Sequence, residues 1–127
     1  MENCIFCKII KGEVPAVKIW EDEKYLVFLD MKPINSGHLL VIPKNHSDYA
    51  FDLNDKEYSE LMLKSKEIAK KLKDKLKSKR IGMIIEGFGV PHVHVHLVPI
   101  NAVMELNPER AKLSSDKELE KIAKRIK

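Results

Sequence analysis

The sequence predicts an α+β domain in two layers, an antiparallel sheet with one long helix packed across it, plus a C-terminal helix. Three observations predict this fold. Short apolar runs bounded by turn residues, typical of strands, occur in the first half of the chain and again near its end. Residues 54–76 repeat apolar side chains every three or four positions, as an amphipathic helix does. Residues 92–98 alternate strictly, as a strand with two unlike faces does.

The N-terminal half supplies a short helix and three strands. Residues 4–11 form an apolar segment of one or two helical turns, closed by a glycine. Residues 17–20 and 25–30 are two strands, and the acidic turn between them predicts a hairpin. A turn rich in Pro, Asn, Ser and Gly then leads to an apolar strand at residues 38–43.

The long helix and the final elements complete the fold. Asn54 is the expected start of the long helix, and Glu57 in its first turn complements the helix dipole. Residues 81–86 form a further strand, and a glycine-rich loop leads from it to the histidine-rich strand. After an irregular stretch, Ser115 and its neighbours cap a last helix. No repeat or linker divides the chain, so we expect one domain over residues 1–127.

Composition and charge restrict the class of partner. The net charge of +4 fits an anionic partner such as a nucleotide. Most of the excess lysine lies in residues 64–80, where it predicts the solvated face of the long helix, so a nucleic acid is the less favoured partner. No apolar run is long enough for a membrane span. The start lacks the pattern of a secretory signal, and two cysteines make no disulfide framework, so we expect a cytoplasmic location.

Three of the five histidines, His92, His94 and His96, alternate within one apolar run. In a strand their imidazoles lie on one face, with Cα atoms roughly 7 Å apart, while the intervening apolar residues face a core. Buried imidazoles need polar partners, which makes them poor core residues. They are well suited to hold a phosphate, bind a metal or attack an electrophile. A half-exposed strand with accidental histidines and a metal-binding row are the alternatives.

Cys4 and Cys7 form a C-x-x-C motif at the start of the chain. A redox pair would need a strand–helix–strand setting, and two cysteines in an apolar segment can also be simple core residues. A tetrahedral zinc site needs two more ligands. His46 and His92 can supply them, and the four residues would then tie the N-terminus to the sheet. The spacing does not match a zinc finger, so the structural zinc site is a hypothesis.

This assignment leaves His38, His94 and His96 for chemistry. A neutral imidazole nitrogen attacks phosphorus well when its other nitrogen donates a proton to a fixed acceptor. Flanking imidazoles can donate to the phosphate oxygens as charge develops. The middle position of the triplet best meets these needs. No phosphate-binding loop of the G-x-x-x-x-G-K type competes.

The motif His-Val-His-Val-His-Leu-Val at residues 92–98 resembles the signature of the histidine-triad (HIT) family of nucleotide hydrolases and transferases. Residues 4–10, 25–30 and 37–46 also resemble family segments, in the family's order. The similarity covers about residues 4–99, which leaves a C-terminal extension outside the shared core. It implies a homodimer that releases a nucleoside monophosphate, usually AMP, from phosphoanhydrides or phosphoramidates. Dinucleoside polyphosphates and AMP-linked amines are the expected substrates.

The resemblance also implies a role for each matching residue. His94 matches the nucleophile that becomes nucleotidylated, and His38 and His96 match the histidines beside the phosphate and the leaving group. Asp30 matches the acid that holds the ribose hydroxyls. The apolar slot for a purine base matches Ile5, Phe6, Ile9, Phe28 and Met31. Family members with the cysteine pair resemble the zinc scheme above.

The chain departs from the family pattern just before the triad. Many members carry a longer loop with a Gly-Gln-Ser or Gly-Gln-Thr motif, whereas residues 86–91 here are Glu-Gly-Phe-Gly-Val-Pro. Backbone amides of Gly87 and Gly89 are the expected substitutes for the missing donors. The altered loop motivates a second hypothesis, a nucleotide-binding adaptor with little turnover. The lysine-rich helix motivates a third, a hydrolase that processes adenylated nucleic-acid ends.

Overall fold

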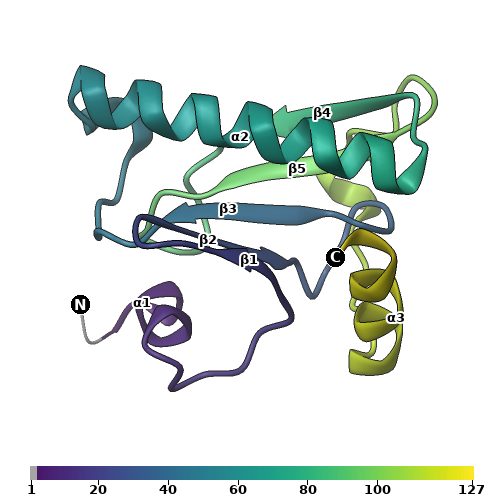
Figure 1. Ribbon diagram of the computed structural model, residues 1–127, viewed down its shortest axis with the longest axis horizontal. Coiled ribbons are helices and arrows are strands. Elements are labelled where there is room, and N and C mark those ends of the chain that lie inside the picture. Colours follow the sequence, from purple (N-terminus) through teal and green to yellow (C-terminus); the bar gives the residue numbers. More distant parts are fainter. Residues whose placement is uncertain (1–2) are drawn as a thin grey trace.

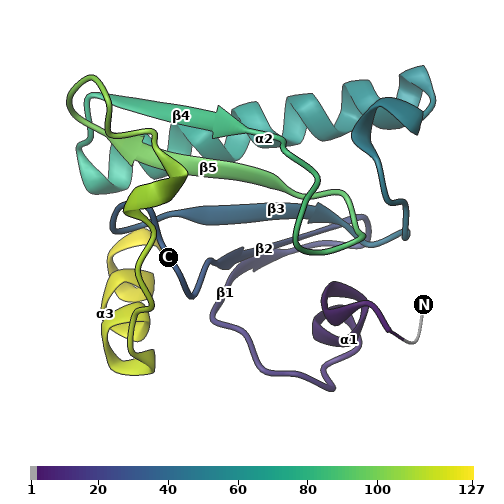
Figure 2. The ribbon, with the colours of Figure 1, turned by 180° about the vertical axis from the view of Figure 1, so that it is seen from behind.

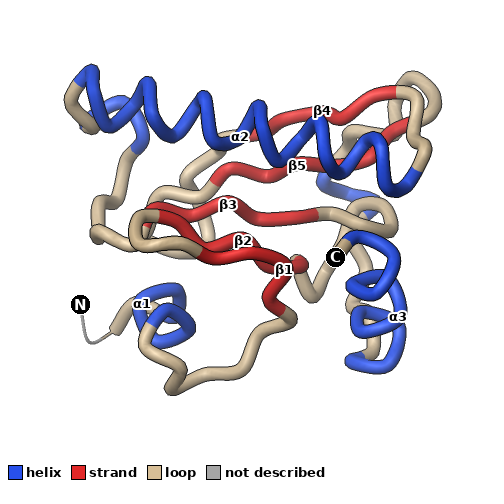
Figure 3. Tube along the Cα trace, in the orientation of Figure 1, coloured by secondary structure: helices blue, strands red, loops and turns tan. Residues whose placement is uncertain are grey.

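Five antiparallel strands form one sheet in the computed structural model, which describes residues 3–127 (Figure 1). The strands are β1 (Lys18–Glu21), β2 (Tyr25–Leu29), β3 (Leu39–Pro43), β4 (Arg80–Ile84) and β5 (Val95–Ile100). Their order in the sheet is β1-β2-β3-β5-β4. The helices of this part of the chain are α1 (Ile5–Ile10), α2 (Asp55–Leu76) and α3 (Asp116–Ile126), and short 3-10 turns occur at Ala50–Asp52 and Pro108–Arg110 (Figure 3). The predicted α+β class is confirmed.

The alternation of apolar side chains gives the sheet two different faces. In β2, Val27 and Leu29 join the larger core cluster under α2, whereas Leu26 and Phe28 join a smaller cluster with α1. In β3, Leu39 and Val41 likewise join the larger cluster and Leu40 and Ile42 the smaller one, since successive side chains of a strand point to opposite faces. Consequently α2 covers one face of the sheet, and the short helix α1 lies against the other (Figures 1 and 2).

The long helix forms where its periodicity predicts. Asn54 accepts a hydrogen bond from the Glu57 amide, and the Glu57 side chain accepts one from the Asn54 amide, which is a complete capping box. Leu61, Ile68 and Leu72 are buried against the sheet, and the lysines face outward. The helix has 22 residues, but none of the helices in residues 3–127 is long and apolar enough to cross a membrane.

The C-terminal helix α3 stands at one end of the sheet, beside β1 and across from α1 (Figure 2). Ser115 caps it, as predicted, by accepting a hydrogen bond from the Glu118 amide. Leu119, Ala123 and Ile126 are buried and join the core cluster under α2. One side of α3 thus extends the core, and its first turns remain available to line the opposite face of the sheet.

The histidine-rich strand is shorter than the alternation predicts, because β5 begins at Val95 rather than at His92. If the pairing of β3 with β5 continued beyond Val95, it would reach Pro43 on β3, and proline has no amide hydrogen to donate to the ladder. Instead, the Val93 amide donates to the carbonyl of Ser47 at 2.7 Å. The expected faces are nevertheless kept, since Val93 and Val95 lie in the core under α2. The strand predicted at residues 81–86 likewise ends earlier, at Ile84.

Candidate functional site

A tight turn before β3 fixes the orientation of His38. The His38 amide donates to the carbonyl of Asn35, and the Ile34 amide donates to His38 Nδ1 at 3.0 Å. Gly37 within this turn has φ +89°, and a Cβ there would collide with Leu76. Because Nδ1 of His38 accepts a hydrogen bond, its neutral ring carries the proton on Nε2.

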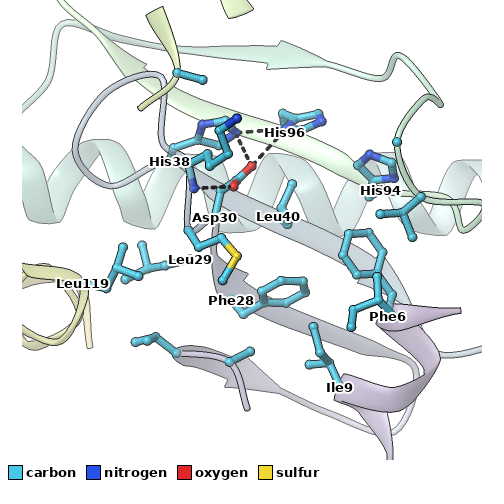
Figure 4. A pocket seen from close by; sticks show the side chains of 18 of the residues that line it. Phe6, Ile9, Phe28, Leu29, Asp30, His38, Leu40, His94, His96 and Leu119 are labelled. Atoms are coloured by element: carbon cyan, nitrogen blue, oxygen red, sulfur yellow. Dashed lines mark hydrogen bonds and ion pairs between the residues drawn. The ribbon is translucent and has the colours of Figure 1, made fainter. Parts of the chain in front are cut away.

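His38, His96 and Asp30 form a polar cluster beside this turn (Figure 4). His38 Nε2 lies 2.9 Å from His96 Nδ1. Since His38 Nε2 carries the proton, His96 Nδ1 accepts and the proton of His96 is on its own Nε2. The Asp30 carboxylate lies 3.6 Å from His38 Nε2 and 3.9 Å from His96 Nδ1. The Ile34 amide therefore donates a hydrogen bond to His38, and His38 donates one to His96.

Burial keeps both imidazoles of this cluster neutral at neutral pH. Burial lowers the pKa of His38, and the Asp30 carboxylate offsets part of that effect. Burial, with the neighbouring His38 and His94 rings, lowers the pKa of His96 to about 4. Neutral rings can donate and accept hydrogen bonds along this chain of donors without a net charge in the cluster.

We expect the free energy of unfolding to fall by a few kcal/mol as pH drops from about 6.5 to about 4, these being the unfolded and folded pKa values of His96. In this window the unfolded chain binds a proton that the folded chain does not, so stability rises with pH. Urea denaturation at several pH values checks this, with His96→Gln as the comparison. Since the other groups still titrate in the variant, its slope should be shallower, and equal slopes would contradict the assignment.

His94 is held in the state that a nucleophile needs. It is only 5% exposed, and its Nδ1 donates to the carbonyl of His92 at 2.7 Å. Its proton is therefore on Nδ1, and Nε2 carries a free lone pair. Within residues 3–127 no hydrogen bond to Nε2 occurs. The edge of the ring packs on Phe6, at 5.2 Å between ring centres, and on His96 at 5.0 Å.

These histidines open into a cavity of about 880 Å³ between α1 and α3 (Figure 4). Phe6 and Ile9 from α1 and Phe28 from β2 form one apolar side, a surface of the kind on which a planar ring packs. Ile5 and Met31 also line the cavity and are exposed rather than buried in a core. The polar groups Asp30, His38, His94 and His96 converge above this apolar side.

Sequence reasoning placed most of these residues together but missed others. Gly89 of the altered loop lines the cavity, whereas Gly87 does not. Phe88 lies between them at the cavity rim and is 79% exposed. At the other end, α3 contributes Asp116, Leu119 and Glu120. No local pattern in the sequence predicts which residues of α3 reach the cavity, because the position of α3 depends on its contacts with α2 and β1.

The cavity lining is acidic although the whole chain is basic. Four carboxylates line it, Asp30, Glu86, Asp116 and Glu120, and Lys32 is the one lysine among the described lining residues. The two titrating histidines of the cluster add no charge at neutral pH. The chain as a whole has a net charge of +4. Because Glu86, Asp116 and Glu120 are exposed, solvent screens part of this charge, and the lining disfavours a highly negative ligand only to that reduced extent.

The second polar cluster, which we call the Cys/His cluster, joins Cys4, Cys7, His46 and His92. Their ligand atoms all lie within 4.8 Å of one another. Cys7 Sγ lies 3.3 Å from His46 Nδ1, and His92 Nδ1 lies 3.4 Å from Cys4 Sγ and 3.6 Å from Cys7 Sγ. The two histidine Nδ1 atoms are 3.2 Å apart.

These distances fit a single zinc ion. With the usual Zn–S and Zn–N bond lengths, a regular tetrahedron separates sulfur from nitrogen by about 3.5 Å and two nitrogens by about 3.3 Å. His92 Nε2 donates to the carbonyl of Pro43 at 2.7 Å, so its Nδ1 is unprotonated and free to bind metal. Burial lowers the pKa of His92, which favours the neutral ring that a ligand requires.

Asp30, His38 and His96 also group three candidate ligands, one carboxylate and two imidazoles, but their proton arrangement does not fit a metal. A cation at His38 Nε2 would need the proton of His38 on Nδ1. That nitrogen already accepts from the Ile34 amide, so two hydrogens would face each other. The position of the imidazole proton, which leaves a nitrogen free for metal in the Cys/His cluster, therefore indicates hydrogen bonding rather than metal binding for this group.

Comparison with known proteins identifies the class. A sequence model of the HIT domain matches residues 11–103, and the chain belongs to the HIT family. It is 36% identical over 103 residues to the protein Hit of Bacillus subtilis, covering 77% of this chain and 71% of that protein. It is 38% identical over 99 residues to an adenosine 5′-monophosphoramidase of Schizosaccharomyces pombe, covering 76% of this chain and 74% of that protein.

Solved structures show the same fold over nearly the whole chain. A HIT-like protein of Bartonella henselae superposes with a TM-score of 0.87 at 30% identity, covering 99% of this chain and 95% of that one. A zinc-bound histidine-triad protein of Mycobacterium smegmatis superposes with a TM-score of 0.84 at 28% identity, covering 98% of this chain and 91% of that one. The second of these proteins is a zinc-bound member of the same family.

Proposed function

We propose that this protein is a hydrolase that releases AMP from phosphoramidates through a nucleotidyl intermediate on His94. The observation that carries the proposal is the state of His94, with its Nδ1 proton fixed by the His92 carbonyl and its Nε2 free at the cavity. The relatives named adenosine 5′-monophosphoramidase support the choice of bond and nucleotide. Dinucleoside polyphosphates, which the family resemblance also implies, are the second substrate class.

In this proposal the apolar side of the cavity binds the base and Asp30 binds the ribose. Phe6, Ile9 and Phe28 offer a planar slot, and Ile5 and Met31 add apolar surface at its edge. Asp30 Oδ1 accepts from the Lys32 amide, which leaves Oδ2 to accept from a ribose hydroxyl. The backbone amide of Gly89 is a candidate donor to the phosphate, and Gly87, outside the lining, has lost that support.

The reaction then follows in two displacements. His94 Nε2 attacks phosphorus, the P–N bond breaks, and the amine leaves with a proton taken from solvent, while the Nε2–H of neutral His96 donates a hydrogen bond to a phosphoryl oxygen. Water next attacks the phosphorus of the His94 adduct, breaks the P–Nε2 bond and releases a proton to solvent. His38 holds His96 in the tautomer that this donation needs, through their 2.9 Å hydrogen bond. The products are AMP and the free amine.

The acidic lining supports phosphoramidates over dinucleoside tetraphosphates as substrates, because an AMP amide carries much less negative charge. We expect Glu86→Gln to lower the preference for an AMP–amine over diadenosine tetraphosphate by about threefold to tenfold, which is the effect of one partly screened charge. The ratio of the two kcat/KM values checks this. Glu23→Gln, in the β1–β2 turn outside the cavity lining, is the matched control and should leave the ratio unchanged. A wild-type preference for the tetraphosphate would contradict the assignment.

A structural zinc ion at the Cys/His cluster belongs to the same proposal. Cys4, Cys7, His46 and His92 would hold it, and it would fix the N-terminus against the sheet without entering the chemistry. The separations of the donor atoms support it, as does the zinc-bound relative. Both cysteines are free of disulfides, so both sulfur atoms are available as ligands.

We further propose the homodimer that the family resemblance implies. β4 is an edge strand of the sheet and exposes Met83, so its pairing with a second copy would continue the sheet. A role at nucleic-acid ends gains no support. The lysines lie on α2, which covers one face of the sheet, whereas the cavity lies on the opposite face, beside α1.

A further inference from the structure

The Cys/His cluster and the cavity share two structural parts. Cys4 caps helix α1 and Cys7 lies within it, and the cavity residues Ile5 and Phe6 lie between them. On the other side, His92 belongs to the cluster and lies two residues before His94. A change at one site must therefore act on parts that belong to the other.

The first connection is through α1. The helix has six residues, too few to be stable alone, so its position depends on its contacts. Its N-cap is Cys4, whose sulfur accepts from the Cys7 amide at 3.4 Å. Phe6 packs edge-on against Phe28 at 5.5 Å, His92 at 5.9 Å and His94 at 5.2 Å between ring centres. Phe6 thus touches the base slot, the Cys/His cluster and the nucleophile at once.

The second connection is through the backbone of His92. The Nε2 atom of its ring donates to the Pro43 carbonyl, and the Nδ1 atom faces Cys4 Sγ and His46 Nδ1 in the cluster. Its carbonyl accepts the Nδ1 proton of His94. A metal that fixes the ring of His92 therefore also fixes the acceptor that sets the tautomer of His94.

We infer that metal binding at the Cys/His cluster and nucleotide binding in the cavity are coupled, each raising the affinity of the other, with Phe6 and His92 as the positioning residues. Without metal, the bonds that hold α1 and the ring of His92 are absent. Part of the free energy of AMP binding is then used to order both. Coupling of this kind is reciprocal, so the two affinities change by one common factor. Typical couplings between sites predict a factor of about ten. The inference rests on the proposed function only for the choice of AMP as ligand.

Calorimetry of AMP binding tests the coupling directly. The dissociation constant for AMP is measured with zinc-loaded protein and with protein stripped by a chelator, and circular dichroism checks that both are folded. The affinity for zinc is then measured by chelator competition with and without AMP. We expect both affinities to change about tenfold. Equal AMP affinities in the two forms would overturn the coupling and leave the proposed function intact, whereas absence of AMP binding in both would count against the proposed function itself.

A second measurement tests the coupling without metal-free protein. It therefore applies even if the stripped protein unfolds. Cobalt(II) replaces zinc, and its visible absorption reports the geometry of the Cys/His cluster. AMP should shift this spectrum in the wild type, and Phe6→Leu should remove most of the shift. Ile10→Ala is the matched control on α1, since Ile10 packs on the same core but does not line the cavity, and it should keep the shift. A wild-type spectrum that AMP leaves unchanged, under saturating AMP, would overturn the inference.

Discussion

Replacing His94 with alanine is expected to lower the hydrolysis of an AMP phosphoramidate by about 10⁴-fold or more, the usual cost of losing a nucleophile. In the proposed mechanism the ring supplies the attacking nitrogen, and no other side chain in the described cavity has a free, correctly protonated nitrogen in its place. AMP binding should persist, because the base slot and Asp30 do not depend on the ring. Steady-state kinetics and calorimetry of AMP binding measure the two effects.

His94→Asn serves as the second variant, because its smaller polar side chain keeps a donor for the His92 carbonyl but cannot accept the nucleotide. It should be as inactive as the alanine variant. If either variant keeps a rate within tenfold of wild type, His94 is not the nucleophile. If both lose AMP binding together with turnover, the effect is structural, and the role given to His94 fails its test.

Removing the metal is expected to lower the melting temperature by about 10 °C or more. Structural zinc sites contribute several kcal/mol or more to folding, and each kcal/mol corresponds to a few degrees in a chain of this size. Cys7→Ser should give a similar loss, since it removes one of two sulfur ligands from a buried cluster. Differential scanning calorimetry checks both.

A chelator provides the control for this prediction. It should lower the melting temperature of the wild type and leave that of Cys7→Ser almost unchanged, because the variant has no tightly bound metal to lose. Equal melting temperatures with and without chelator in the wild type would show that the cluster contributes no metal-dependent stability. Metal analysis of the purified protein identifies the ion.

Much of the site could be predicted because it follows local rules. Strict alternation over residues 92–98 sends the histidines to one face even where the backbone leaves the ladder, since Val93 and Val95 still pack under α2. Elimination among five histidines also grouped His46 and His92 with the cysteines, as the structure does. In these cases the pattern and the tertiary structure agree.

The remaining features depend on long-range packing that no local pattern records. The late start of β5 follows from Pro43 on a neighbouring strand. The proton arrangement of His38 depends on the Ile34 amide, which a turn places against the ring. The contribution of α3 to the cavity depends on how Leu119 and Ala123 dock against the core.

The central claim is covalent transfer of the nucleotide to His94, and intact-protein mass spectrometry tests it most directly. The protein is mixed with an AMP phosphoramidate, quenched within milliseconds without acid, which would hydrolyse the P–N bond, and then digested to map any adduct. The account predicts a transient mass increase of one adenylyl group, located on His94 and absent from His94→Ala. Release of AMP at the wild-type rate with no adduct at any time, in a reaction where adduct decay is the slow step, would contradict it.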